Sequence, residues 1–143
     1  MKSARRQARE DALKILFQFD WNSTLSVETA VVHFESFFKL NPTPVVDFTK
    51  ELVQGVIQNR KELDAAIRQV SEHWRPERMP SVDRNVLLLG AYELLYRKDI
   101  PATVTINEMI DIVKTFGSEN SASFVNGVLD KLKARFYKED KAP

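Results

Sequence analysis

Four basic side chains near the start of the sequence have types and spacing that suit contact with phosphate. Lys2, Arg5, Arg6 and Arg9 stand at positions i, i+3, i+4 and i+7, and no acidic residue occurs among the first nine. A helix that begins early would align all four along one side, where clustered cations can displace counterions from a nucleic-acid backbone. Because cations at a helix N-terminus are disfavoured by the macrodipole, stability alone does not select this pattern. A flexible, solvated start fits the same residues, and charge alone does not separate the two interpretations.

A second group of side chains, near the end of the sequence, could bind an unpaired base. Asn120 and Ser121 offer small polar groups close to the aromatic ring of Phe124. Stacking on aromatic rings, with hydrogen bonds to base edges, is how proteins recognise single-stranded RNA. The spacing of Phe124 relative to Val125, Val128 and Leu132 is equally compatible with a place in the core. Both interpretations stay open at this point.

No other set of residues suggests catalysis, a metal site or a bound cofactor. The chain has no cysteine and two histidines, His33 and His73, which lie far apart in the sequence. This rules out thiolate chemistry and offers no metal-ligand spacing. The four glycines form neither a phosphate-binding loop nor a dinucleotide fingerprint. We therefore predict a binding protein with no catalytic residues, no metal and no cofactor.

Composition indicates one compact cytoplasmic protein. The chain has 143 residues, of which 43% are hydrophobic, enough to build a core. The absence of cysteine fits a reducing compartment, and no stretch resembles a membrane span or a secretory signal. The net charge is only +1. Because the first nine residues carry four positive charges, the remaining chain is net negative, an asymmetry that favours a nucleic-acid or anionic partner.

Apolar residues recur at helical spacing along nearly the whole chain, so we predict an all-α fold of about seven helices. The first helix is expected from Ala4 to Trp21, with its core face formed by Ala8, Ala12, Ile15, Leu16 and Phe19. A second helix follows, then a break at residues 41–44, which include two prolines. Further helices are expected from about Val45, near residue 60, from Ser81, and near residues 105 and 120. The run from Val86 to Ala91 is apolar on all sides and should form the buried centre.

Local signals refine the last helices. Thr105 and Glu108 have the spacing of a capping box, with Val104 and Met109 placed to form a hydrophobic staple. Gly117 is expected to end that helix in a left-handed conformation. Gly90 and Gly127 lie inside predicted helices, where glycine costs about 1 kcal/mol, so close helix packing is their expected reason.

The helices are expected to form two packed subdomains. The stretch from Trp74 to Pro80 contains two prolines and is the best candidate for a linker. It would separate an N-terminal helical half of about residues 1–75 from a C-terminal half of about residues 80–137. Together these halves make a single domain of residues 1–143.

Several segments resemble the NusB transcription antitermination family. Residues 116–131, which run from Phe116-Gly117 through Phe124-Val125-Asn126-Gly127 to Lys131, are similar to the C-terminal signature of that family. Residues 106–108 resemble the block that precedes it, residues 4–10 its arginine-rich start, and residues 90–94 its central helix. Residues 22–75 match only as a helical pattern. The resemblance is most specific over residues 105–131.

This resemblance implies a function and its site residues. It implies an all-helical protein that pairs with the ribosomal protein NusE, binds the boxA element of RNA and joins the antitermination complex of RNA polymerase, notably on rRNA operons. The implied RNA contacts are Lys2, Arg5, Arg6 and Arg9 for phosphates, Phe124 for stacking, and Asn120 and Ser121 beside it. Phe17 and Asp83 occupy positions that face the protein partner in the family, although some members carry tyrosine at the first. Asn120 stands where some members carry aspartate, and loss of that negative charge favours the approach of RNA.

Two other functions compete with this one. A related module forms the N-terminal part of some rRNA cytosine methyltransferases, but the sequence leaves no room for a cofactor-binding sheet or a catalytic cysteine. A purely structural, dimerising helical protein would show no affinity for RNA and no salt dependence. The family surface can pair with NusE or with a second copy, so the sequence does not specify whether the protein is a homodimer.

Overall fold

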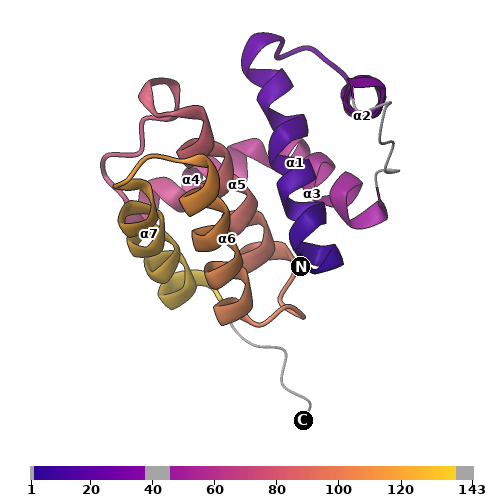
Figure 1. The fold of residues 1–143 in the computed structure, drawn as a ribbon. Helices are drawn as coiled ribbons and strands as arrows, with labels where there is room; N and C mark the ends of the chain where they lie inside the picture. Colours follow the sequence, from indigo (N-terminus) through magenta and orange to yellow (C-terminus); the bar gives the residue numbers. More distant parts are fainter. Residues whose placement is uncertain (1, 38–45, 138–143) are drawn as a thin grey trace. The chain divides into compact units, whose positions relative to one another are not determined.

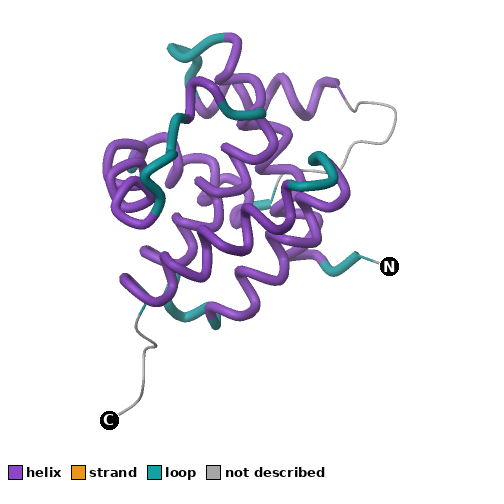
Figure 2. The backbone as a smooth tube through the Cα atoms, turned by 90° about the vertical axis from the view of Figure 1, so that its left-hand side faces the viewer, coloured by secondary structure: helices purple, strands orange, loops and turns teal. Residues whose placement is uncertain are grey.

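The computed structural model describes residues 2–37 and 46–137, and within these ranges the chain is helical and contains no strand (Figure 2). The predicted all-α class and the seven α-helices are confirmed for these ranges, and one 3-10 turn is added. The predicted break at residues 41–44 lies outside the described residues. No helix in the described ranges is long and apolar enough to cross a bilayer.

The chain divides into two compact units, residues 1–58 and residues 59–143. This boundary differs from the predicted linker at Trp74–Pro80. The physical reason is that Trp74 is buried, with its indole N–H donating to Asp64 Oδ1 at 2.9 Å. Arg84 further holds this stretch by donating to the carbonyl of Pro76 at 2.9 Å. Residues 74–80 are therefore part of the second unit.

The first unit consists of α1 (Ala4–Trp21), α2 (Val27–Phe37) and α3 (Asp47–Gln58). Helix α1 begins where predicted because the side chain of Ser3 accepts the N–H of Arg6 at 3.0 Å. Its predicted core face is buried at Ala8, Ala12, Ile15 and Leu16, whereas Phe19 is only half-buried. Helix α3 packs along α1, and Thr49 Oγ1 donates to the carbonyl of Ala8 at 3.1 Å.

The second unit consists of α4 (Arg60–Val70), the turn η1 (Pro76–Arg78), α5 (Ser81–Tyr96), α6 (Ala102–Phe116) and α7 (Ser121–Phe136). Helices α5, α6 and α7 contact one another in pairs, and α4 packs against α5 and α7 (Figure 1). The predicted buried centre is confirmed, since every residue from Val86 to Ala91 is buried.

The predicted capping box at Thr105 and Glu108 is wrong, because α6 begins earlier, at Ala102. Pro101 precedes the helix at a place where its missing N–H costs nothing. Thr105 instead lies inside α6 and donates from Oγ1 to the fully buried Glu93 Oε1 at 2.9 Å. The hydroxyl of Thr105 therefore bonds Glu93 on α5 and does not form the N-cap that the local motif predicted.

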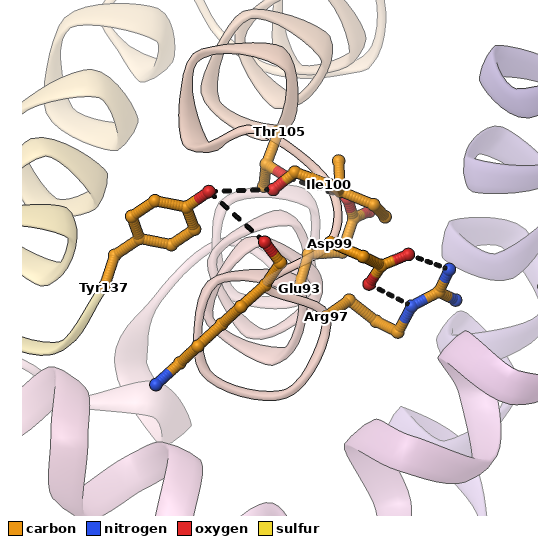
Figure 3. A network of polar contacts seen from close by, with 7 residues as sticks. Glu93, Arg97, Asp99, Ile100, Thr105 and Tyr137 are labelled. Atoms are coloured by element: carbon orange, nitrogen blue, oxygen red, sulfur yellow. Dashed lines mark hydrogen bonds and ion pairs between the residues drawn. The ribbon is translucent and has the colours of Figure 1, made fainter. Parts of the chain in front are cut away.

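Polar contacts also hold the loop between α5 and α6 (Figure 3). Arg97 binds Asp99 through two hydrogen bonds, of 2.9 and 3.0 Å. From the end of α7, the hydroxyl of Tyr137 points at the carbonyls of Ile100 (3.2 Å) and Lys98 (3.4 Å). These hydrogen bonds connect the C-terminal end of α7 to the loop that precedes α6.

The two glycines inside helices have different roles. A Cβ atom on Gly90 would lie 2.7 Å from Leu129 Cδ2, so close packing of α5 on α7 explains this glycine as predicted. A Cβ atom on Gly127 would meet no atom within 4 Å, so the packing explanation is wrong there. Gly127 carries the helical cost of glycine without a packing contact that requires it.

We expect Gly127→Ala to raise the free energy of unfolding by up to about 1 kcal/mol, because alanine is the better helix former and open space surrounds the new methyl group. Gly90→Ala is the matched control, since the same helical gain is opposed by overpacking against Leu129. Urea unfolding of both variants should show the larger gain for Gly127→Ala. A loss of stability in that variant would show that Gly127 is required by the fold.

Candidate nucleic-acid interface

The basic start of the chain is only partly arranged as predicted. Arg5 is exposed and Arg6 half-buried, both in the first turn of α1, and that turn contains no acidic residue. Lys2 precedes the helix, and its Nζ lies 2.7 Å from Oε1 of the buried Glu10. A single exposed stripe of four cations is therefore not present. The positive charge that remains at the surface comes from Arg5, Arg6 and Lys2. The ammonium group of Lys2 is also paired with Glu10.

Arg9 is the clearest departure from the prediction. It is 2% exposed, and its guanidinium carbon lies 5.4 Å from the ring centroid of Phe48 on α3. The guanidinium of Arg9 is therefore not exposed as the predicted stripe required, and its contact with phosphate stays a prediction. Phe48 belongs to α3, which packs on α1, so this helix contributes to the surroundings of Arg9.

Sequence reasoning missed Phe48. Its half-buried ring also lies beneath Arg5, whose guanidinium carbon is 4.1 Å from the ring centroid. The only sequence signal was an aromatic residue at the start of an amphipathic helix, which does not reveal which helix it meets. The structure thus adds an aromatic ring to the basic group.

Burial also affects the carboxylate of Asp11 on α1. Desolvation raises the pKa of Asp11 above its ordinary value of 3.8, opposed by a hydrogen bond from Gln7 and by the charge of Lys14. The folded chain therefore binds a proton at Asp11 more tightly than the unfolded chain. The contribution of Asp11 to stability is greatest below pH 3.8 and is lost as the pH rises through the raised folded pKa.

The start of α7 carries the second group. Phe124 is 37% exposed, so the core interpretation of its spacing is wrong and the ring is accessible. Asn120 is exposed one turn before it, at the N-cap position, and its side chain makes no capping hydrogen bond. The backbone N–H of Phe124 bonds the carbonyl of Asn120 at 3.4 Å, which places the amide group and the ring one turn apart. An open aromatic face beside a polar amide can stack and pair with an unstacked base.

Ser121 and Asp83 are bound to each other in the interior. Ser121 is 2% and Asp83 7% exposed, and Ser121 Oγ donates to Asp83 Oδ1 at 2.7 Å. The N–H of Ser118 donates to the same Oγ at 3.0 Å. Because the only hydroxyl proton of Ser121 goes to the carboxylate, the Ser118 hydroxyl, 2.9 Å away, must be the donor in that pair. Neither the predicted RNA contact Ser121 nor the predicted partner contact Asp83 is presented at the surface, and both instead hold the first turn of α7 against α5.

Gly117 leads into this turn but does not adopt the predicted left-handed conformation. Its φ of −99° and ψ of −174° are extended. A Cβ atom there would lie 2.8 Å from the carbonyl oxygen of Val113 and 2.9 Å from Ser121 Oγ. Close approach, and not backbone conformation, explains this glycine.

We expect Asp83→Ala to lower the free energy of unfolding by about 1–3 kcal/mol, because the buried hydroxyl of Ser121 loses its acceptor. Asp83→Asn retains an oxygen acceptor and should lose less. Asp99→Ala is a matched control, since Asp99 forms an exposed ion pair with Arg97. Urea unfolding compares the three variants. Equal stability of Asp83→Ala and wild type would show that the Ser121 bond does not hold α7.

Phe17, the other residue predicted to face a protein partner, lies half-buried on α1. The same helix ends at Trp21, whose side chain is 89% exposed. The predicted site residues are thus divided between the units. Lys2, Arg5, Arg6, Arg9 and Phe17 belong to the first, and Asp83, Asn120, Ser121 and Phe124 belong to the second.

Among the described residues, no group of three or more histidine, aspartate or glutamate side chains is arranged to hold a metal ion. Unit 1 contains a mainly apolar hollow of about 420 Å³. It is lined by Lys14, Gln18, His33, Phe34 and Phe37.

Comparison with protein families and relatives supplies independent information. Residues 6–134 match the model of a family described as the NusB family. The transcription antitermination protein NusB of Desulfitobacterium hafniense (strain DSM 10664 / DCB-2) is 41% identical over 138 residues, covering 96% of this chain and 93% of the relative. The protein of the same name from Anaeromyxobacter dehalogenans (strain 2CP-1 / ATCC BAA-258) is 47% identical over 132 residues, covering 92% of each.

Solved structures are similar over nearly the full length. T. maritima NusB has a TM-score of 0.81 and 37% identity, covering 96% of both chains. A crystal structure of the antitermination factors NusB and NusE in complex with dsRNA contains a chain with a TM-score of 0.80 and 25% identity. This match covers 95% of the present chain and 100% of that one.

Proposed function

Because this chain belongs to the NusB family, we propose that it is a transcription antitermination factor that binds RNA together with a NusE partner. The proposed binding of RNA rests on the exposed ring of Phe124 beside the exposed Asn120. An accessible aromatic ring beside a polar amide can stack an unpaired base and bond its edge. The similar chain solved with NusE and dsRNA supports the binding of RNA together with NusE.

We propose that the RNA contacts fall into two groups. Phe124 stacks a base and Asn120 bonds a base edge, while Arg5, Arg6 and Lys2 contact phosphates. Arg9 and Ser121 support these groups from the interior, the first beside Phe48 and the second through Asp83. The RNA is a boxA-type element, and the protein works in the cytoplasm within the antitermination complex of RNA polymerase on rRNA operons. In this proposal it binds without catalysing a reaction.

The test is binding of a labelled boxA-type single strand, measured by fluorescence anisotropy across a salt series with and without purified NusE. We expect affinity to fall as salt rises and to increase when NusE is present. A duplex of the same sequence is the second arm, because bases inside a duplex are not available to stack on Phe124. An absence of RNA binding at low salt, with and without NusE, would contradict the proposed function.

Phe17 is the proposed contact with NusE. We expect Phe17→Asp to reduce NusE association at least tenfold while leaving binding of RNA alone within about twofold of wild type, because a charge placed in an apolar contact must be desolvated. Isothermal titration calorimetry with NusE gives the affinity, measured below the melting temperature of the variant. Wild-type affinity for NusE would place the partner on another surface.

A further inference from the structure

The cation–π contact between Arg5 and Phe48 lies within the first unit. Helix α3 is fixed against α1 at this point by Thr49, whose hydroxyl donates to the carbonyl of Ala8 at 3.1 Å. The neighbouring Phe48 thereby places its ring beneath the guanidinium of Arg5, 4.1 Å from the ring centroid. The guanidinium carbon of the buried Arg9 lies 5.4 Å from the same centroid. Two cations of α1 therefore pack against one ring, which has little freedom to turn away.

This geometry keeps the hydrogen-bonding groups of Arg5 available. A guanidinium held over an aromatic ring is bound through its face, whereas its N–H groups point outward in its plane. The side chain of Arg5 is exposed and has no hydrogen bond or ion pair with another residue that the structure describes. The guanidinium is therefore held close to the ring, and its N–H donors are not used by another side chain that the structure describes.

We propose that Phe48 is a positioning residue that holds the guanidinium of Arg5 ready for bidentate hydrogen bonds to an RNA phosphate. Such a fork matches the geometry of two phosphate oxygens. An unsupported arginine would lose side-chain freedom on binding, whereas one already held against a ring has lost much of it before RNA arrives. This inference rests on the proposed RNA-binding function and assigns to Phe48 a role within it.

The experiment is a double-mutant cycle between Arg5→Ala and Phe48→Leu, read by anisotropy with a labelled single-stranded RNA at fixed salt. Leucine fills the half-buried position without an aromatic face, and thermal melting confirms that the variants are folded at the temperature of measurement. We expect Phe48→Leu to weaken binding about three- to tenfold in the wild-type background. In the Arg5→Ala background the same change should alter affinity less than about twofold, because the group that it positions is gone.

Three further variants separate positioning from a general structural role. Phe48→Tyr keeps the ring face and should retain wild-type affinity. Arg5→Lys keeps the charge and hence the salt slope, but loses the planar fork and should bind more weakly. Phe48→Leu combined with Phe124→Ala is the control for additivity, since Phe124 lies in the other unit and its loss should add to that of Phe48.

The possible failures are distinguishable. Equal weakening by Phe48→Leu in the presence and absence of the Arg5 side chain would overturn the positioning role and leave the proposed function intact. Wild-type RNA affinity of Phe48→Leu, combined with weaker binding by Phe124→Ala, would also overturn the positioning role of Phe48 and leave the proposed function intact. If the wild-type protein bound no RNA at low salt, with or without NusE, the proposed function itself would fail.

Discussion

Phe124→Ala is expected to melt close to wild type and to bind single-stranded RNA about 5- to 150-fold more weakly. The ring is 37% exposed, so its truncation leaves no closed cavity in the core. A base that stacks on an aromatic side chain contributes about 1–3 kcal/mol of binding free energy, which corresponds to this range of affinity. Phe124→Tyr should retain most of the affinity, because the face of the ring persists. Thermal melting and anisotropy on the same samples measure both quantities.

A matched control for this change is Phe37→Ala. Phe37 is a more exposed phenylalanine, on α2 of the first unit, outside both proposed RNA-contact groups. Its replacement removes the same aromatic ring and should leave RNA affinity unchanged. A large fall in the melting temperature of Phe124→Ala, combined with normal binding by the folded fraction, would show that the ring stabilises the fold and does not contact RNA.

The second large effect is expected at the basic start of α1. There Arg5 is exposed and Arg6 half-buried, whereas Arg9 is buried. Replacing both Arg5 and Arg6 by alanine should weaken RNA binding and reduce the slope of log affinity against log salt. The expected reduction is about 0.7 for each phosphate that the variant no longer neutralises. The loss of Arg5 should change folding little because its side chain is exposed, and thermal melting of the Arg6→Ala single variant measures the contribution of the half-buried Arg6. Anisotropy at several salt concentrations gives the slope.

Arg9→Ala should behave in the opposite way. Its side chain is buried beside Phe48, so we expect a loss of about 1–3 kcal/mol in the free energy of unfolding. The salt slope of the folded variant should stay close to wild type. An unchanged slope in the Arg5 and Arg6 double variant, or a reduced slope in Arg9→Ala, would show that exposure in the free protein does not identify the phosphate contacts.

Most of the helices and of their buried faces could be predicted from local sequence patterns. An apolar stripe repeats within a few residues along the chain, so it can be recognised without knowledge of distant partners. This is why the bounds of α1 and the buried run from Val86 to Ala91 agree with expectation. The basic and aromatic residues of the candidate interface could be identified in the same way, from residue type and local spacing.

Which of those candidates are exposed and which are buried depends on contacts between residues far apart in the sequence. Ser121 bonds Asp83, 38 positions away in the sequence, and Thr49 bonds Ala8, the neighbour of the buried Arg9, across 41 positions. For Thr105, a buried partner on α5 overrode a local capping motif. The spacing of Phe124 fitted both core and surface, because a residue at the edge of an apolar stripe is covered or exposed according to how its helix is rotated against its neighbours. Such rotation is set by packing between helices, and no local pattern contains it.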